Sequence, residues 1–330
     1  MTYIFLIGAE HQLFQVDIAI SHFKIEKKSI ILIIEKVSNN HKFIGKVCNS
    51  DVYGEVIIFE SWTFKDLFKN PRKHQFFINL CLRFANQKIF FLASHYDSDS
   101  TLLFNSIVKP SKYFLMDEGT ASFSVQIQRN SFEFKSKLKV FVKSLFYKKE
   151  ISLPKELMYF TKFELNLPKN DKKVVYKVEK NNNPLTLLNQ EELIFIGSSI
   201  VELKMIEEAA YINCLAKVVV ENKKKISKFY YYPHRKECVE KLNKIIKLGF
   251  EIKYLDEPFE PFFSKQIEIS SIICSFYTTS VIYNIAESNI KLPKLIIFKF
   301  DSNLLKTHRL VYENIYKTIK TNKLINCFDI

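Results

Sequence analysis

The sequence has very little glycine, with six residues in a chain of 330. At the average usage of about 7%, a protein of this length would have roughly 23 glycines. Neither GxGxxG nor GxxxxGK[ST] occurs, which excludes a Rossmann dinucleotide fingerprint and a P-loop. Collagen-like repeats and Gly/Ser linkers are excluded as well. Any phosphate that this chain binds must therefore be held without a glycine-rich loop.

The sequence also lacks the patterns of secreted and membrane-spanning proteins. No two of its six cysteines form a CxxC or another zinc-binding spacing, so we expect reduced thiols, a cytoplasmic location and no metal site. Met1 to Gly8 lacks the basic and long apolar regions of a signal peptide and predicts a strand instead. No apolar run approaches the length of about 18 residues that a transmembrane helix needs.

The charge balance is strongly basic. Lysine and arginine number 49 against 35 aspartates and glutamates, for a net charge of +14 at pH 7. Such a surface favours nucleic acid, anionic lipid or phosphorylated substrates. The lysines are scattered, and no nucleic-acid-binding module is recognisable. We therefore expect contact with an anionic membrane surface and none with nucleic acid; a non-enzymatic basic anion- or nucleic-acid-binding protein is an alternative.

Short apolar runs alternate with stretches of helical periodicity, a pattern typical of a parallel α/β sheet. The first half predicts strands at residues 3–7, 29–34, 56–59, 89–92 and 113–116. The second half predicts strands at residues 193–196, 229–232, 252–255, 272–276 and 295–298. The main predicted helices cover residues 13–23, 64–84, 200–220, 238–248 and 304–319. We expect two Rossmann-like domains facing across a cleft, 1–165 and 185–330, with a polar, proline-containing connection at about 146–190.

An acidic motif, Asp117-Glu118-Gly119, directly follows the predicted strand at residues 113–116. Open α/β sheets bind ligands beyond the carboxyl ends of their strands, so a carboxylate there is well placed to act as a general base. Burial or a neighbouring like charge would raise its pKa toward a useful range. The alternative is an acidic turn in which the glycine takes a positive φ.

Three further polar sets follow strand ends in the second half. His234 lies between a strand and a helix, next to Pro233 and Arg235, where it could contact a phosphate. The other two sets open helices and supply hydroxyls and backbone N–H groups; they are Thr278-Thr279-Ser280 and the segment with Gly197, Ser198 and Glu202. Plain helix capping and a surface histidine are the alternatives. Together the sets fit the transfer of a group from a nucleotide phosphate without a metal.

These motifs resemble those of the bacterial sialyltransferases of the GT-B fold, and most closely glycosyltransferase family 52, the lipooligosaccharide and capsule sialyltransferases. Asp117-Glu118-Gly119 matches the acidic motif of these families. Pro233-His234 is similar to their His-Pro motif, and Thr278-Thr279-Ser280 to their Ser-Ser/Thr motif. Gly8 to Leu13 also resembles the N-terminal strand-turn segment of the family. The matches occur in the family's order and span about residues 1 to 290.

The resemblance implies an inverting, metal-independent transfer of sialic acid from CMP-sialic acid to a terminal galactose on a bacterial surface glycan, with no cofactor. Glu118 would remove the acceptor proton, with Asp117 as the alternative, and His234 would stabilise the departing CMP phosphate. Nucleotide contacts would come from Gly119, Gly197, Ser198, Glu202, Pro233, Arg235, Glu260, Thr278, Thr279 and Ser280. The enzyme would be peripheral, at the inner face of the cytoplasmic membrane. A homodimer is one expectation for an oligomeric state that the sequence leaves open.

Two departures from the family pattern favour an alternative sugar donor. Arg235 follows His234 where the family has proline, and the third motif begins with threonines where serines are usual. The alternative is a transferase of the same fold that uses another nucleotide sugar, such as a hexosyl or Kdo donor.

Overall fold

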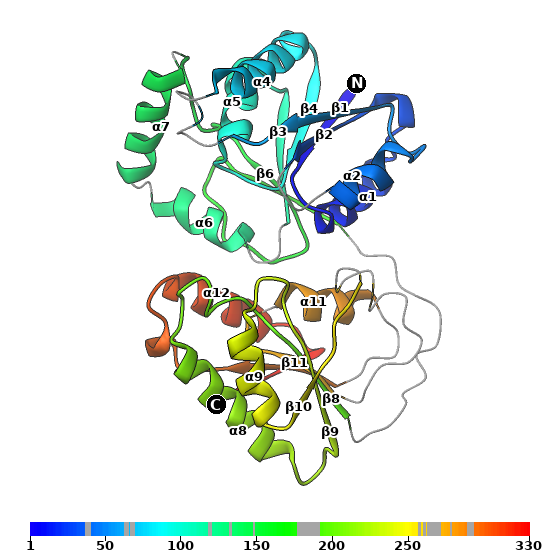
Figure 1. The fold of residues 1–330 in the computed structure, drawn as a ribbon. Coiled ribbons are helices and arrows are strands. Elements are labelled where there is room, and N and C mark those ends of the chain that lie inside the picture. The colour runs from blue at the N-terminus through cyan, green and yellow to red at the C-terminus, as the bar shows by residue number, and fades with distance from the viewer. Residues whose placement is uncertain are drawn as a thin grey trace. The chain divides into compact units, whose positions relative to one another are not determined.

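The chain folds into two compact units, Met1–Tyr176 and Lys177–Ile330. The computed structural model (Figure 1) describes residues 1–36, 41–62, 66, 70–117, 121–131, 134–147, 149–176, 192–256, 259, 262, 272–277, 279–288 and 294–330. Each unit is a parallel sheet covered by helices, and the two are described separately below as the N-terminal and C-terminal domains.

A seven-stranded parallel sheet forms the centre of the N-terminal domain, in the order β3-β2-β1-β4-β5-β6-β7. The order reverses between β1 and β4, as it does at the switch point of a doubly wound fold. Its strands are β1 (Thr2–Ile7), β2 (Ile30–Lys36), β3 (Glu55–Glu60), β4 (Ile89–Ala93), β5 (Lys112–Met116), β6 (Met158–Thr161) and β7 (Lys172–Val175).

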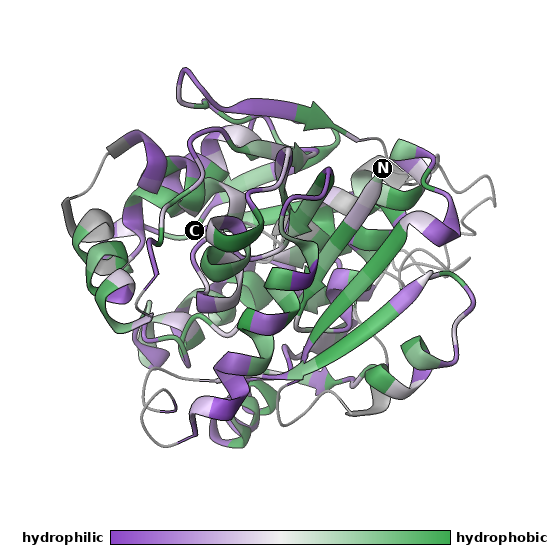
Figure 2. Cartoon of the chain, turned by 90° about the horizontal axis from the view of Figure 1, so that it is seen from above, coloured by the Kyte–Doolittle hydropathy of each residue, from purple (hydrophilic) through white to green (hydrophobic). Residues whose placement is uncertain are grey.

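The inner strands of this sheet are continuously apolar because helices cover both of their faces. Ile4 and Phe5 in β1 and Leu32 and Ile33 in β2 have no solvent exposure, and the strands stand out as hydrophobic in Figure 2. Phe91 of β4 stacks on a helix residue, Phe104, with ring centroids 4.2 Å apart. The described helices are α1 (His11–Phe23), α2 (His41–Cys48), α4 (Pro71–Phe84), α5 (Asp99–Val108), α6 (Ala121–Ser131) and α7 (Phe134–Tyr147).

The C-terminal domain repeats the same design with a six-stranded parallel sheet in the order β10-β9-β8-β11-β12-β13. Its strands are β8 (Glu192–Ile196), β9 (Lys228–Tyr232), β10 (Phe250–Ile252), β11 (Ile272–Ser275), β12 (Lys294–Lys299) and β13 (Ile325–Asp329). Its described helices are α8 (Glu208–Asn222), α9 (Val239–Lys247), α11 (Thr279–Ser288) and α12 (Arg309–Ile319). The switch point lies between β8 and β11, so the turns that follow these strands share one edge of the sheet.

Several elements differ from the sequence expectation. Strands β6 and β7 lie in the stretch expected to be the connection, and they extend the N-terminal domain past the expected boundary at residue 165. They are only four residues long and contain polar residues, so periodicity does not reveal them. The edge strand β13 was missed for the same reason, since its residues are mostly exposed.

Helix α8 begins at Glu208 rather than at residue 200. The preceding residues form turns in which Lys204 has a φ of 56°, and Ile206 makes an isolated antiparallel bridge to Leu305. The apolar spacing there imitates a helix because Ile200, Met205 and Ile206 are buried in the turns themselves. Helix α12 likewise begins at Arg309 and not at residue 304.

Candidate functional site

Two strand-to-helix turns meet at the carboxyl edge of the C-terminal sheet. Strands β8 and β9 pair in register, Ile196 with Tyr232, so the chain leaves both strands at the same level. The backbone N–H of Gly197 donates to the carbonyl of Tyr232 at 2.8 Å. The predicted nucleotide segment after β8 and the predicted phosphate histidine after β9 are therefore neighbours.

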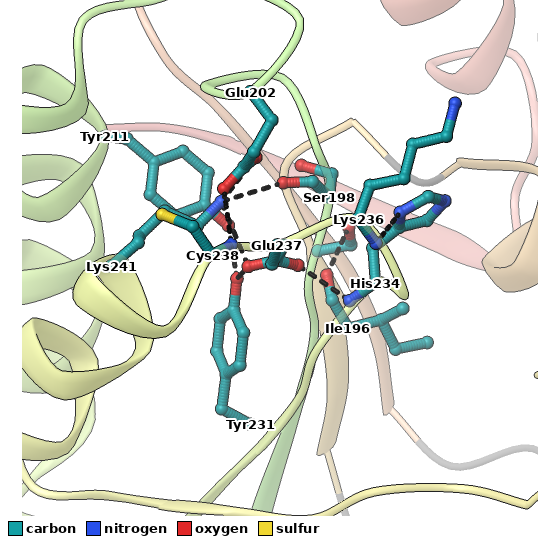
Figure 3. A network of polar contacts seen from close by, with 11 residues as sticks. Ile196, Ser198, Glu202, Tyr211, Tyr231, His234, Lys236, Glu237, Cys238 and Lys241 are labelled. Atoms are coloured by element: carbon teal, nitrogen blue, oxygen red, sulfur yellow. Dashed lines mark hydrogen bonds and ion pairs between the residues drawn. The ribbon is translucent and has the colours of Figure 1, made fainter.

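A fully buried lysine, Lys241 of α9, lies beneath both turns (Figure 3). Its ammonium group is 3.0 Å from the carboxylate of Glu237 and 3.1 Å from that of Glu202. It also donates to the carbonyl of Ser198 at 3.2 Å and lies 4.6 Å from the ring centroid of Tyr211. One buried cation thus binds both turns, and because a buried charge must be paired, these contacts are interdependent. We call Lys241, Glu237 and Glu202 the lysine cluster.

Glu237 connects the lysine cluster to the histidine turn. One carboxylate oxygen accepts the backbone N–H of His234 at 2.7 Å, and the other accepts the hydroxyl of Tyr231 at 2.7 Å. The Tyr231 hydroxyl also contacts that of Tyr211 at 2.8 Å. Burial raises the pKa of Glu237, and the charge of Lys241 opposes that rise. Glu237 holds the backbone of the turn rather than facing a ligand.

His234 itself is half-buried, and its ring points away from Glu237 and Lys241 (Figure 3). Its Nδ1 accepts the backbone N–H of Lys236 at 3.2 Å. A neutral imidazole that accepts through Nδ1 carries its proton on Nε2, which makes Nε2 a donor. Arg235 and Lys236 are exposed beside it. The turn therefore carries an imidazole N–H and, next to it in sequence, two exposed cationic residues, which are groups that bind anions.

Gly197 is required by packing at this edge. A Cβ added there would lie 2.6 Å from the hydroxyl of Tyr231, and closer still to a carboxylate oxygen of Glu237. Real Cβ atoms do not make such contacts, so a side chain at this position would push the two residues away from the turn. Glycine here permits the tyrosine and the lysine cluster to approach the backbone.

The third predicted set is placed at the same edge by its strand. Strand β11 pairs with β8, and the buried hydroxyl of Ser275 donates to the carbonyl of Ile196 at 2.9 Å. Thr279 and Ser280 form the first turn of α11, whose N-terminal backbone groups therefore lie beyond β11. Of these two residues the structure describes the backbone alone. Thr278 and Glu260 lie outside the described residues.

In the N-terminal domain, Asp117 is buried at the end of β5. Its carboxylate accepts the hydroxyl of Ser122 at 2.6 Å, the backbone N–H of Lys162 at 3.1 Å and the hydroxyl of Tyr176 at 3.1 Å. Burial raises the pKa of Asp117, and the hydrogen bond from Ser122 and the charge of Lys162 oppose that rise. These contacts fix the ends of β5, β6 and β7 and favour a structural role for Asp117. Glu118 and Gly119 lie outside the described residues.

A second carboxylate at the edge of this sheet was missed from the sequence. Glu35, near the end of β2, accepts the hydroxyl of Ser61 at 2.7 Å and that of Ser100 at 3.1 Å. Gly8, at the end of β1, lies beside it. A single acidic residue in an apolar strand does not by itself predict a functional carboxylate. Its position near the end of the strand was the one feature of the sequence that could have identified it. In the neighbouring turn, the buried Gln12 accepts the backbone N–H groups of Gly8 and Ala9.

The described part of the chain has neither a metal-binding cluster nor a helix that could span a membrane. Its His, Cys, Asp and Glu side chains form no group of three or more that could hold a metal ion. None of its helices combines the length and the apolar character needed to cross a bilayer.

Known proteins resemble this chain in fold. No family model and no curated protein sequence matches it. Among solved structures, HepE of Anabaena in complex with UDP-glucose aligns with a TM-score of 0.52 at 8% identity, over 91% of this chain and 81% of that one. Phytolacca americana UGT2, complexed with UDP-2-fluoro-glucose and pterostilbene, gives 0.49 at 9% identity over 99% and 85% of the two chains. Acinetobacter baumannii MurG gives 0.46 at 8% identity over 100% and 86%.

Identities this low establish the fold alone. The alignment with HepE, together with the two parallel sheets, confirms the predicted class: the chain consists of two Rossmann-like α/β domains of the GT-B fold.

Proposed function

We propose that this protein is an inverting glycosyltransferase that moves sialic acid from CMP-sialic acid to a galactose-type hydroxyl of a bacterial surface glycan, lipooligosaccharide or capsule. The observation that carries the proposal is the position of His234. It lies beside the switch point of the C-terminal sheet, with Nδ1 occupied by a backbone N–H and the ring pointing away from the lysine cluster. In the GT-B fold this edge of the sheet is where a nucleotide is expected.

The proposed chemistry depends on charge developing at the leaving phosphate. As the bond from the sugar to the phosphate oxygen breaks, the sugar passes through an oxocarbenium-like state and CMP takes the electron pair. The Nε2–H of His234 donates to that phosphate, with Arg235 and the first turn of α11 as further donors. These groups stabilise one phosphate without requiring a divalent cation.

The acceptor hydroxyl needs a base to take its proton as the new bond forms. We propose Glu118 for that role, because the carboxylate of Asp117 already accepts three hydrogen bonds from the protein. Glu35 is another carboxylate at a strand end of this domain. The enzyme would work at the inner face of the cytoplasmic membrane, where its net positive charge favours anionic lipid.

A second candidate keeps the fold and the phosphate site but changes the donor. HepE was solved with UDP-glucose, and it is similar to this chain over most of its length. Arg235 stands where the sialyltransferase pattern has proline. An extra cation beside the histidine would suit the second phosphate of a nucleoside diphosphate. On this reading the reaction is transfer of a hexose from UDP or GDP.

A thermal-shift series with CMP, UDP and GDP separates the two candidates. A nucleotide present at about 100 times its Kd stabilises the domain that binds it by about 2.7 kcal/mol. We expect CMP to raise the melting temperature in the presence of EDTA. Stabilisation by UDP and not by CMP would favour the second candidate, a transferase that uses a UDP-linked sugar. Salt-dependent DNA binding without any nucleotide effect would contradict both.

A matched pair of variants tests His234. We expect H234Q to lower kcat for CMP release by about a hundredfold or more, with a smaller change in KM, because the imidazole acts on charge that develops in the transition state. The control is H308Q, since His308 is an exposed histidine of the same domain, before α12. Near-native kcat in H234Q would contradict the role given to His234.

A further inference from the structure

Helix α7 of the N-terminal domain exposes a row of large apolar side chains, while part of its inward face is polar. Val140 packs against the hydrophobic core of the domain. Beside it, Lys143 pairs with Asp99 at 2.5 Å, and the hydroxyl of Ser144 contacts the backbone of Ile151. At its end the Tyr147 hydroxyl accepts the indole N–H of Trp62 at 3.1 Å. In a globular protein the polar face of a surface helix is normally the one that faces water.

The outward face of α7 is apolar. Leu138, Phe141, Val142 and Leu145 have exposed fractions of 50%, 60%, 38% and 62%. Their spacing of i, i+3, i+4 and i+7 places them on one stripe of the helix. Single exposed hydrophobic residues are ordinary, but a contiguous stripe of large ones indicates an interaction surface. Figure 1 shows α7 at the outer edge of the N-terminal domain.

The charge of α7 indicates what this stripe contacts. The helix sequence, Phe134 to Tyr147, contains four lysines and neither aspartate nor glutamate. The whole chain carries a net charge of +14. An apolar stripe on a helix with basic residues and no acidic ones is the pattern of a helix that lies in the interface of an anionic membrane.

The size of the stripe argues against a second copy of the chain as its partner. Even an aromatic side chain presents no more than about 250 Å², so four side chains that are about half exposed present less than about 550 Å². A stable protein interface buries about 800 Å² on each partner. Two like-charged helices facing each other would also repel. A bilayer needs no matching surface, since it accepts side chains to a shallow depth.

We propose that α7 is the membrane-docking element of this protein, and that Leu138, Phe141, Val142 and Leu145 insert into the headgroup and acyl-chain boundary of an anionic bilayer. Lys143 takes no part in this contact because it pairs with Asp99, and the remaining positive charge of the helix favours the anionic lipid headgroups. The inward contacts of Lys143 and Ser144 keep the helix on the domain while its apolar face is in lipid. This assignment does not depend on which nucleotide sugar the protein uses.

Vesicle co-sedimentation of the full chain tests the proposal. The probes are vesicles of phosphatidylcholine alone and of phosphatidylcholine with phosphatidylglycerol. We expect binding to the anionic vesicles, and L138S/L145S to weaken it about tenfold or more, because two apolar side chains no longer enter the bilayer. The matched control L310S/L324S also removes two exposed leucines, from the C-terminal domain, and should bind like the parent chain.

Three outcomes would overturn the proposal. The first is equal binding by L138S/L145S and the parent chain, and the second is equal loss in the control variant. The third is a dimer of the parent chain that L138S/L145S converts to a monomer without any change in vesicle binding. Thermal melting of each variant confirms that the protein remains folded, which we expect because the substituted side chains are exposed.

A spectroscopic readout tests insertion directly. The chain has one tryptophan, Trp62, and it is buried. A second tryptophan in F141W should shift its emission to the blue on anionic vesicles and be quenched by brominated lipid. L310W is the control, and it should show neither effect. Equal quenching of tryptophan emission in F141W and L310W, or no quenching in F141W, would show that α7 is not the element that enters the bilayer.

Discussion

Asp171 and Arg129 form the buried ion pair of the N-terminal domain. The guanidinium makes two hydrogen bonds of 2.5 Å to the carboxylate, which also accepts the backbone N–H of Leu157. Replacing Asp171 with alanine leaves a largely buried guanidinium without its carboxylate, although Tyr96 and the carbonyl of Pro154 still accept from it. The cost should therefore be about 3 kcal/mol, the lower end for a buried pair. We expect D171A to lower the free energy of unfolding by about that amount, as measured by urea titration.

An exposed pair of similar geometry serves as the control. Arg83 and Glu55 are joined by two hydrogen bonds of 2.6 and 2.7 Å at the surface. Solvent screens such a pair, so E55A should cost less than about 1 kcal/mol. Equal losses in D171A and E55A would show that burial does not determine the contribution of these pairs.

Gly197 gives a prediction about packing at the candidate site. In G197A the new Cβ would collide with Tyr231 and Glu237, so the histidine turn must move. We expect a loss of about 1–3 kcal/mol in stability, typical of overpacking, and weaker nucleotide binding in the same thermal-shift series. G45A is the comparison, since a Cβ at Gly45 meets nothing within 4 Å. If nucleotides raised the melting temperature of G197A as much as that of the parent chain, Gly197 would not contribute to nucleotide binding.

At the scale of elements, the lysine cluster couples the turn after β8 to the turn after β9. The most direct test is E202Q, which keeps a hydrogen-bond acceptor for the backbone of Cys238 but removes one charge facing Lys241. K241M is the stronger variant, and it leaves two carboxylates without their buried cation. We expect both to reduce the nucleotide-induced thermal shift, and K241M to destabilise the protein by about 3 kcal/mol or more.

The control lies one turn further along the same helix. Lys244 pairs with Glu208 at the surface of α9, and K244M should leave the nucleotide-induced shift unchanged. A reduced shift in K244M equal to that in E202Q would indicate a general effect of charge. In that case the coupling of the two turns would not be the cause.

The site could be predicted from the sequence only in part, and the reason differs from residue to residue. His234 and Gly197 were predicted because they follow apolar strands, and the structure places both at one edge of the C-terminal sheet. Lys241 was missed because lysine in an amphipathic helix normally predicts an exposed position. Its burial depends on Glu202, 39 residues away in sequence, and no local pattern shows that contact.

At the scale of the whole molecule, the fold too was predictable where the sequence pattern is local, and it was not predictable where an element depends on distant residues. Inner strands such as β1 and β8 are buried on both faces, and their continuous apolar sequences predicted them. Edge strands such as β7 and β13 have exposed residues and depend on a neighbour for their hydrogen bonds. Right-handed crossovers leave few possible topologies for alternating strands and helices, so the fold class was easier to predict than the ends of its elements.

The stability of the protein should also depend on pH through Asp117. Its pKa is raised in the fold above the ordinary value of 3.8, so the native state binds the proton more tightly than the unfolded state does. Stability from this group therefore increases as pH falls through the raised pKa, and it stops increasing below about 3.8. As pH falls from 7, the unfolding free energy of the parent chain should increase relative to that of D117N, which has no carboxyl group at this position. A shift in favour of D117N would contradict the sign.

The central claim is that the whole molecule transfers a sugar from a nucleotide donor, and mass spectrometry of the products tests it most directly. The full chain is incubated with CMP-sialic acid and a panel of galactosides in the presence of EDTA, beside H234Q and H308Q. We expect a sialylated galactoside and free CMP from the parent chain and H308Q, and about a hundredfold less from H234Q. Parallel incubations with UDP- and GDP-linked hexoses cover the second candidate. No sugar transfer from any of these donors, or equal product from H234Q, would contradict the proposal.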